Sequence, residues 1–248
     1  MPELPEVETV RRGLQQQTST MAIARVQVHR ARAIAAPRHD PEAFVAAMEG
    51  RQLKQWNRRG KYLIAELDQG HWGVHLRMTG QFLWLEAERS QQHPPCRHTR
   101  VQLWDPQGRE LRFIDTRSFA EMWWVPPNQP VASVITGLQR LGPEPFDPAF
   151  DAAYLKRKLT GSRRPIKNAL LDQALVAGVG NIYADESLFA SGIRPATASG
   201  RLSLARLEGL RQALVSVLEQ SIGAGGTTFS DFRDLTGTNG NYGGMAWV

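Results

Sequence analysis

Residues 1–14 read MPELPEVETVRRGL, and the interpretation of the whole chain depends on this opening stretch. Pro2 is small enough for Met1 to be removed after synthesis, which would leave a free secondary amine on a rigid ring. A terminal amine titrates near pH ~8, so an appreciable fraction is neutral and nucleophilic at physiological pH. Glu3 adds a carboxylic acid beside that amine. The stretch therefore predicts either an active site at the chain end or an ordinary amphipathic starting helix.

The residues that follow Glu3 are typical of a helix pinned to a core. Pro5 suits the first turn of a helix, where its missing N–H costs nothing. Val7, Val10 and Leu14 recur at helical spacing and form one apolar stripe. A buried helix would hold the amine and the acid in a defined place.

Composition limits the possible functions. The 248 residues are 42% hydrophobic and 22% charged, which is ordinary for a globular protein of one large or two modest domains. The net charge of +6 favours a polyanionic partner, nucleic acid first, although a solubilising surface is the simpler alternative. No apolar run is long enough for a membrane span, and no signal peptide is visible. The single cysteine, Cys96, excludes a disulfide framework and fits a cytoplasmic location.

The first half of the chain has the alternating pattern of β-strands, which suggests a sandwich or barrel. Polar residues over 87–98 predict a loop, and the turn 105–108 predicts a hairpin. The expected strands are 24–28, 62–67, 72–76, 82–85, 101–103, 111–113 and 122–125.

After the proline-rich residues 126–148 the apolar period becomes helical. Helices are expected over 150–159, around 170–178, over 181–190 and around 207–217, and the Gly-rich residues 223–248 are expected to form a mobile loop. We thus predict an α+β fold, in which an N-terminal β-sandwich with a leading helix precedes a helical domain. The expected divisions are a sandwich domain (1–130), a linker (131–148), a helical domain (149–222) and a terminal region (223–248).

Several exposed residue types in the sandwich suit contact with DNA. Lys61 follows Gly60 and precedes an apolar strand, so it either reaches a cleft or is a solvated strand-end lysine. Met78, Arg117 and Phe119 stand at expected loop tips, where such side chains can wedge into a duplex and replace an extruded base. For Phe119 taken singly, a core contact is the simpler interpretation.

A Gly-rich turn in the helical half suits the DNA backbone. Residues 178–183 read GVGNIY and place backbone N–H groups at the start of a helix, where anions bind. The upstream run SRRPIK (162–167) adds basic side chains. A helix–turn–helix with a basic run before it indicates binding to the DNA backbone.

Together these features resemble formamidopyrimidine-DNA glycosylases, bifunctional base-excision repair enzymes of the formamidopyrimidine-DNA glycosylase/endonuclease VIII family. The resemblance extends from Met1 to Val248 and rests on five motifs: residues 2–8, 59–62, 75–78, 115–119 and 178–186. It implies a helix-two-turn-helix in the helical domain. It also implies a monomer that removes oxidised purines (8-oxoguanine and formamidopyrimidines) from duplex DNA and then cuts the strand at the abasic site, with no cofactor for catalysis.

The resemblance assigns catalytic roles to four residues. It makes Pro2 the nucleophile that attacks C1′ of the damaged nucleotide and forms a Schiff base. It makes Glu3 the general acid that protonates the sugar ring oxygen, with Glu6 supporting the site from the first helical turn. Lys61 would contact phosphate and assist the β-elimination.

It also implies two sets of DNA contacts. The residues implied to touch the backbone are His75, His98, Arg163, Lys167 and Asn181. Those implied to fill the space left by the everted base are Met78, Arg117 and Phe119.

The C-terminus departs from the family pattern. Complete members of this bacterial type continue past a Trp-Val like Trp247-Val248 into a zinc ribbon held by four cysteines, which carries an arginine used in δ-elimination. We therefore expect a truncated chain or a zincless variant, with residues 223–248 forming a lesion-capping loop and the start of a missing hairpin, and no metal ligands. A non-catalytic lesion-binding relic of the family is one rival hypothesis. A general-base proline, as in tautomerases, is another, in which the basic helical half has no role.

Overall fold

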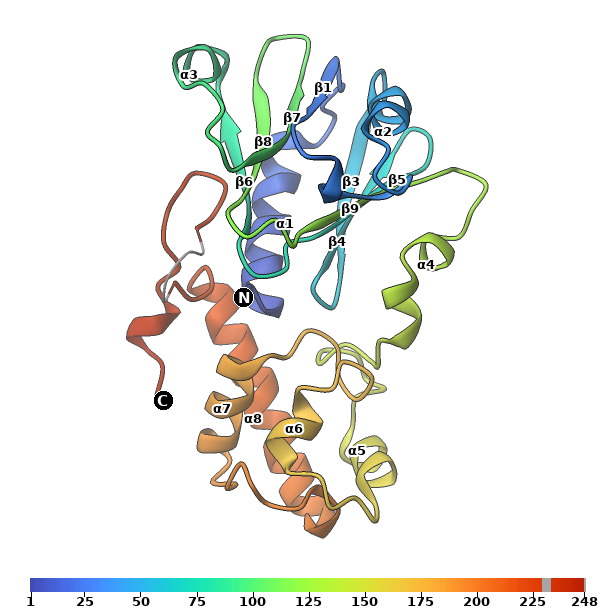
Figure 1. Cartoon of the computed structure of the whole chain (residues 1–248). Coiled ribbons are helices and arrows are strands. Elements are labelled where there is room, and N and C mark those ends of the chain that lie inside the picture. Colours follow the sequence, from blue (N-terminus) through green and yellow to red (C-terminus); the bar gives the residue numbers. More distant parts are fainter. Residues whose placement is uncertain (229–232, 248) are drawn as a thin grey trace.

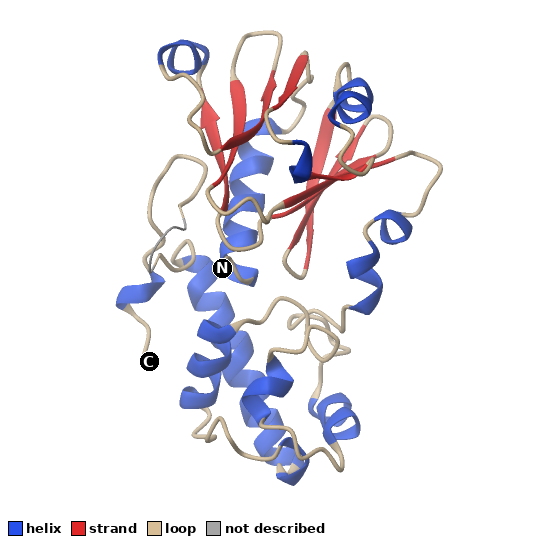
Figure 2. Ribbon diagram, in the orientation of Figure 1, coloured by secondary structure: helices blue, strands red, loops and turns tan. Residues whose placement is uncertain are grey.

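Two β-sheets and a leading helix make up the N-terminal half of the chain, and helices make up most of the C-terminal half (Figure 1). This computed structural model describes residues 1–228 and 233–247. Figure 2 shows that the strands are confined to one half of the molecule. The predicted α+β class, a β-sandwich followed by a helical domain, is confirmed.

The two sheets differ in size and share one apolar core. The four-stranded sheet is antiparallel, in the order β1 (Arg25–Val28), β7 (Thr99–Trp104), β8 (Glu110–Asp115) and β6 (Gly80–Leu85). In the five-stranded sheet only the pairing of β2 with β9 is parallel, and the order is β2 (Ile34–Ala36), β9 (Glu121–Val125), β5 (His71–His75), β4 (Tyr62–Leu67) and β3 (Leu53–Arg59).

Helix α1 (Leu4–Thr18) packs against both sheets and contributes its apolar face to their shared core (Figure 1). Its stripe of Val7, Val10 and Leu14 is buried among side chains of both sheets, as predicted. Pro5 lies in its first turn, and the Glu3 N–H donates to Glu6 Oε2 at 2.8 Å, which satisfies one of the free donors at the helix start. The first residues of the chain are thereby held in place.

The helical half has a second apolar core, centred on the long helix α8 (Leu204–Gly223) and on α7 (Asn181–Ala190). Tyr183 and Phe150 are its largest fully buried side chains outside the C-terminal segment. The remaining helices are α2 (Pro41–Met48), α3 (Ala87–Gln92), α4 (Val131–Val134), α5 (Ala152–Leu159) and α6 (Ile166–Leu170), and 3-10 turns cover Ala31–Ala33, Thr136–Arg140, Ser199–Arg201 and Tyr242–Gly244. No helix in the described ranges has the length and apolar character needed to cross a membrane.

Several local expectations are wrong. The polar stretch 87–98 begins with a helix, α3, because its exposed residues are good helix formers. Strand β3 was not predicted, since only two of its seven residues are buried. The helix expected around 170–178 ends at Leu170, and the chain then turns back toward the chain start. The expected strands 72–76 and 82–85 are confirmed as β5 and β6, which lie in different sheets, and Arg77 between them has a left-handed φ of 53°.

The C-terminal segment contacts both halves. Leu235 is buried in the sandwich core and Tyr242 in the helical core. The Tyr242 N–H donates to the Gly226 carbonyl at 3.0 Å. Leu235 and Tyr242 thus anchor the segment 233–247 to the two cores, while residues 229–232 of the predicted mobile loop lie outside the described ranges. The start of a hairpin strand expected at 246–248 is not formed at Ala246 and Trp247, and Val248 lies outside the described residues.

Candidate active site between the sandwich and the helices

A cavity of about 890 Å³ lies between the two halves, beside the start of the chain. It brings together residues from the chain start, the β3–β4 turn, the end of β5, the interdomain connection and the turn before α7. The predicted site residues that line it are Glu3, Lys61, His75, Met78 and Asn181. Met1 also lines it, and the Pro2 side chain is buried between Met1 and Glu3.

Glu3 is joined to the helical half by hydrogen bonds. Its Oε1 accepts the Ile182 N–H at 3.0 Å and its Oε2 accepts the Tyr183 N–H at 3.5 Å, in the first turn of α7. Helix N-termini stabilise negative charge in this way. A Cβ at Gly180 would lie 2.3 Å from Glu3 Cδ, so the turn needs glycine for the carboxyl group to approach. Gly178 leaves the same kind of space for Leu4 and has a φ of 89°.

The environment of Glu3 suits proton transfer near neutral pH. The side chain is 3% exposed, and burial raises the pKa of Glu3 to about 7. The Lys61 ammonium lowers this pKa, whereas the Glu6 carboxylate raises it further. A carboxyl group with such a pKa exists in both protonation states at pH 7, which general acid catalysis requires.

Lys61 follows Gly60 in the tight turn that joins β3 to β4. Its side chain is 7% exposed, so the solvated strand-end alternative is wrong. Burial lowers the pKa of Lys61, while the nearby carboxylates of Glu3 and Glu6 oppose that shift. The turn thus presents a partly desolvated amine to the cavity.

Glu6 lies behind the cavity, where α1, α7 and α8 meet. The Tyr183 hydroxyl donates to Glu6 Oε1, and the Thr227 N–H donates to the same oxygen at 2.8 Å. Ser221 and Thr227 hydroxyls also contact the Tyr183 oxygen. Burial raises the pKa of Glu6, although these hydrogen bonds favour its ionised form. Glu6 therefore ties the first helix to the segment that follows α8.

His75 faces the cavity as a neutral ring. Burial, together with the charges of Arg77 and Lys61, lowers the pKa of His75 to about 3. Its Nδ1 accepts the Arg77 N–H at 3.0 Å, so its Nε2 carries the ring proton. A fixed N–H donor beside Lys61 suits a phosphate oxygen.

The expected wedge residues stand on exposed turns. Met78 is 37% and Phe119 44% exposed, so a core contact for Phe119 is excluded. The Arg117 guanidinium lies 4.9 Å from the Phe119 ring centre. Asp115 organises this turn, since its carboxylate accepts the N–H groups of Arg117 at 3.2 Å and Ala120 at 2.8 Å. Of the three, only Met78 lines the cavity.

The other expected DNA contacts lie outside the cavity. Lys167 forms an ion pair with Asp185, with 2.7 Å between Nζ and Oδ2. His98 accepts a hydrogen bond of 3.0 Å from Arg97 Nε, and Arg163 is exposed in the loop before α6. These three residues stand apart from the cavity that holds Glu3.

Comparison of this chain with known proteins identifies its family. The family model described as Formamidopyrimidine-DNA glycosylase N-terminal domain matches residues 1–122, and the one described as Formamidopyrimidine-DNA glycosylase H2TH domain matches residues 141–233. A formamidopyrimidine-DNA glycosylase of Parasynechococcus marenigrum is 64% identical over 250 residues, covering 100% of this chain and 88% of the relative. The chain belongs to the formamidopyrimidine-DNA glycosylase family.

Further members of the family are similar to this chain over nearly its whole length. A formamidopyrimidine-DNA glycosylase of Nostoc punctiforme is 55% identical, covering 100% of this chain and 85% of the relative. A Lactococcus lactis Fpg variant, solved in complex with DNA containing Fapy-dG, superposes with a TM-score of 0.88 at 29% identity, covering 99% of this chain and 87% of that chain. The Lactococcus lactis Fpg solved with DNA containing an abasic site has a TM-score of 0.87 at 29% identity, covering 98% and 86% of the two chains.

Two residues of this family member were not singled out from the sequence. Tyr183 belongs to a quoted motif, but nothing local indicates that it reaches Glu6. Gln173 holds the Gly-rich turn, accepting the Gly178 N–H at 2.9 Å and donating to the Val179 carbonyl at 2.8 Å. A single glutamine gives no signal of such a role, because its partners become neighbours only in the folded chain.

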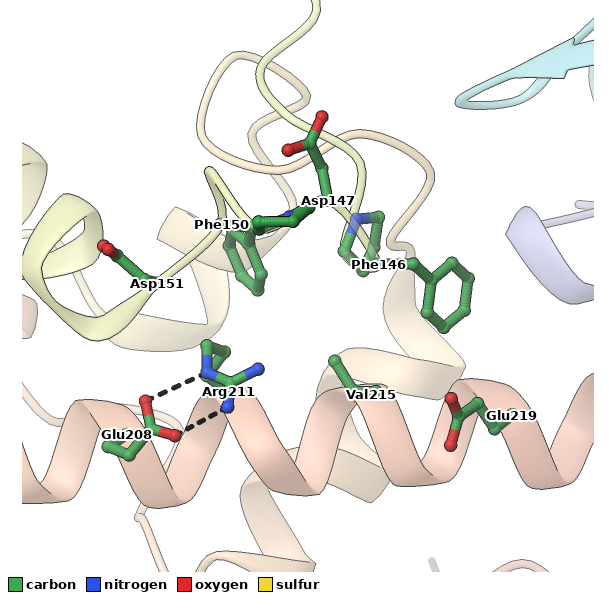
Figure 3. Close-up of a pocket in the computed structure, with 10 residues that line it drawn as sticks. Phe146, Asp147, Phe150, Asp151, Glu208, Arg211, Val215 and Glu219 are labelled. Atoms are coloured by element: carbon green, nitrogen blue, oxygen red, sulfur yellow. Dashed lines mark hydrogen bonds and ion pairs between the residues drawn. The ribbon is translucent and has the colours of Figure 1, made fainter.

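A second hollow lies along α8, away from the chain start. Figure 3 shows Phe146, Phe150 and Val215 around this groove of about 460 Å³, with Arg211 paired to Glu208. Acidic side chains dominate its edge, namely Asp147, Asp151, Glu208 and Glu219. Such a surface repels phosphate, so the cavity beside Glu3 is the better site for DNA.

Metal ligands are not gathered anywhere in residues 1–228 and 233–247: no group of three or more His, Cys, Asp or Glu side chains could hold an ion there. Zinc belongs to the complete members of the family.

Proposed function

We propose that this chain is a bifunctional DNA glycosylase and abasic-site lyase, which removes 8-oxoguanine and formamidopyrimidines from duplex DNA and then cuts the strand. The observation that carries the proposal is the buried Glu3 carboxyl group, held beside the chain start by the N-terminus of α7. Lys61 opens onto the same cavity. We assign residues 1–130 to catalysis, 149–222 to DNA binding, 131–148 to their connection and 223–248 to covering the everted base.

The chemistry begins with the amine of Pro2 once Met1 is removed. The nitrogen lone pair bonds to C1′, the glycosidic bond breaks with its electron pair going to the departing base, and the proton that the nitrogen loses neutralises that base. As the base leaves, Glu3 donates a proton to the ring oxygen, the C1′–O4′ bond opens, and an iminium joins Pro2 to the sugar. A pKa of about 7 for Glu3 leaves a useful fraction able to donate that proton at neutral pH.

Strand scission follows from the iminium. The iminium acidifies the C2′ hydrogen, so loss of that proton expels the 3′ phosphate by β-elimination. Lys61, next to the His75 Nε2–H donor, is suited to hold the departing phosphate and to assist the proton transfers. Its lowered pKa makes proton exchange easier than for an exposed lysine.

DNA binding uses residues around the cavity and beyond it. Asn181, Arg163 and His98 would contact the backbone together with His75. Lys167 would exchange Asp185 for a phosphate oxygen. The exposed side chains of Met78, Arg117 and Phe119 would enter the stack, where displacing a base costs least at a lesion.

Borohydride trapping tests the proposal directly. Protein lacking Met1, verified by intact mass, is mixed with borohydride and a duplex containing 8-oxoguanine, and a covalent protein–DNA adduct is expected. Pro2→Gly is expected to abolish this secondary-amine adduct, while Glu208→Gln, which changes a carboxylate on α8 outside the cavity, retains it. Binding of the duplex with no adduct from the processed protein would contradict the catalytic proposal, and equal trapping by Pro2→Gly would contradict the nucleophile.

A further inference from the structure

The β3–β4 turn that carries Lys61 is gripped by one carboxylate of the interdomain connection. Glu144 Oε1 accepts the Gly60 N–H at 2.6 Å and Arg59 Nη1 at 2.9 Å. Its Oε2 accepts Arg58 Nη1 at 2.8 Å. Three consecutive residues before Lys61 therefore converge on one side chain from a distant part of the sequence.

Lys61 depends on this turn for its position. Its ammonium makes no hydrogen bond or ion pair with any residue the structure describes, and only the longer-range fields of Glu3 and Glu6 act on it. Gly60 has a left-handed φ of 56°, and a Cβ there would lie 3.2 Å from the Leu141 side chain. The backbone of the turn, wedged against the connection, thus determines where the amine lies.

The same contacts link the turn to the helix that carries Glu3. Arg58 Nε donates to Glu8 Oε2 in α1 at 3.2 Å, while Arg58 Nη1 donates to Glu144. Arg59 Nη2 donates to the Gly142 carbonyl. Glu144 also supplies the counter-charge for both arginines, and its side chain is only 21% exposed. Charge-assisted pairs with this little exposure are stronger and less screened than surface pairs.

We propose that Glu144 is a positioning residue for strand scission, which holds the β3–β4 turn so that the Lys61 ammonium stays in place beside the chain start. The proposal rests on the proposed role of Lys61 in β-elimination. Glu144 does not line the cavity, so it acts through the turn rather than on DNA. Small misplacements of a reacting group cost large factors in rate, which makes this grip important for scission.

Single-turnover kinetics on duplexes with a preformed abasic site test the proposal. Glu144→Ala is expected to slow scission about tenfold or more. Borohydride trapping through Pro2, and affinity for a duplex with an uncleavable abasic analogue, are expected to stay within about threefold of wild type. The control Glu208→Gln removes the same charge from another arginine pair, on α8, and is expected to leave scission unchanged.

A second measurement separates position from charge and does not need activity. Carbon-13 NMR titration of the Lys61 Cε, assigned with Lys61→Arg, gives its pKa in each variant. If Glu144 holds the amine in its buried place, Glu144→Ala raises the pKa of Lys61 toward its ordinary value, because the amine gains water. Loss of a negative charge without movement would lower it instead.

Glu144→Gln keeps an oxygen that can accept the Gly60 N–H, but its neutral amide cannot pair with the Arg58 charge. We therefore expect a scission rate and a Lys61 pKa between those of wild type and Glu144→Ala. This variant carries the test if Glu144→Ala does not fold. Scission within about twofold of wild type in a folded Glu144 variant, or a fall in the pKa of Lys61, would overturn the proposal. A wild-type protein that neither traps nor cuts would instead refute the proposed function, and the titration would still decide the role of Glu144.

Discussion

Oε1 of Glu3 accepts a hydrogen bond of 3.0 Å from the Ile182 N–H, so a side chain at the chain start caps α7, which begins at Asn181. The position of the proposed acid, Glu3, therefore depends on N–H donors of the helical half. The contact removes Glu3 from water and at the same time supplies donors for its ionised form.

Gly180→Ala tests the space that Glu3 occupies. The new Cβ would lie 2.3 Å from Glu3 Cδ, so the carboxyl group must move away from the α7 N-terminus. We expect base release in single-turnover assays to fall about 100-fold. Gly209→Ala is the control: no atom lies within 4 Å of its Cβ, and in helix α8 the change is expected to stabilise the protein by up to about 1 kcal/mol. Equal activity of both variants would contradict the assignment of Glu3.

Glu3→Gln should change stability in a pH-dependent way. Burial raises the pKa of Glu3 from 4.5 to about 7, so the folded protein binds this proton more tightly than the unfolded chain. The stability this provides is complete below pH 4.5 and is lost as the pH rises through 7. Denaturant unfolding is therefore expected to find Glu3→Gln more stable than wild type at pH 8, by on the order of 3 kcal/mol, and similar in stability near pH 4.5.

Glu8→Gln is a control for which the expected change in stability at pH 8 has the opposite sign. Burial would raise the pKa of Glu8, but hydrogen bonds from Arg11 and Arg12 outweigh it and lower the pKa. Glu8 therefore contributes stability above its unfolded pKa that is lost as the pH falls, and Glu8→Gln is expected to be less stable than wild type at pH 8. If both variants changed the free energy of unfolding at pH 8 in the same direction, burial would not be what determines the pKa of Glu3.

The rate of base release should have a bell-shaped pH profile. The Pro2 amine must be neutral, which favours pH values above ~8, while Glu3 must be protonated, which favours values below about 7. Single-turnover rates are expected to peak between about 7 and 8 and to fall on both sides. A rate that keeps rising to pH 9.5 would exclude Glu3 as the acid.

Tyr183→Phe removes a hydroxyl that donates to Glu6 Oε1 in the interior. The Glu6 carboxylate then keeps fewer donors while remaining buried, so thermal unfolding is expected to show a loss of about 1–3 kcal/mol, and more at high pH. Tyr154→Phe is the matched control, because its half-buried hydroxyl donates only to the Leu175 carbonyl at 2.9 Å. Similar losses for the two variants would argue against the coupling to Glu6.

Phe119→Ala tests the proposed wedge. Its side chain is 44% exposed, so the free energy of unfolding is expected to change by less than about 0.5 kcal/mol. Preference for a lesion duplex over undamaged DNA, measured by competition binding, is expected to fall about tenfold. Phe146→Ala, with a ring 39% exposed in the acidic groove, should change neither quantity (Figure 3). Unchanged preference in Phe119→Ala would remove that residue from the interface.

Local patterns predicted the elements that have strong local signals. The α1 stripe of Val7, Val10 and Leu14 and the β7–β8 hairpin were predicted because their burial follows a regular period. Strand β3 and helix α6 were not predicted correctly, since pairing with β4 and packing in the helical core decide them rather than their own sequences. Arg77 gave no sign of the left-handed backbone that separates β5 from β6.

The amino-acid sequence by itself determined the resemblance to the family, the α+β class and the candidate residues, because these depend on residue types and their order. Only the tertiary structure decided the state of those residues. The pKa of Glu3 near 7, the neutral ring of His75 and the hold of Glu144 on the Lys61 turn all arise from burial and from partners far away in the chain. Desolvation and hydrogen bonding depend on the neighbours that folding provides, and adjacent residues in the sequence do not reveal them.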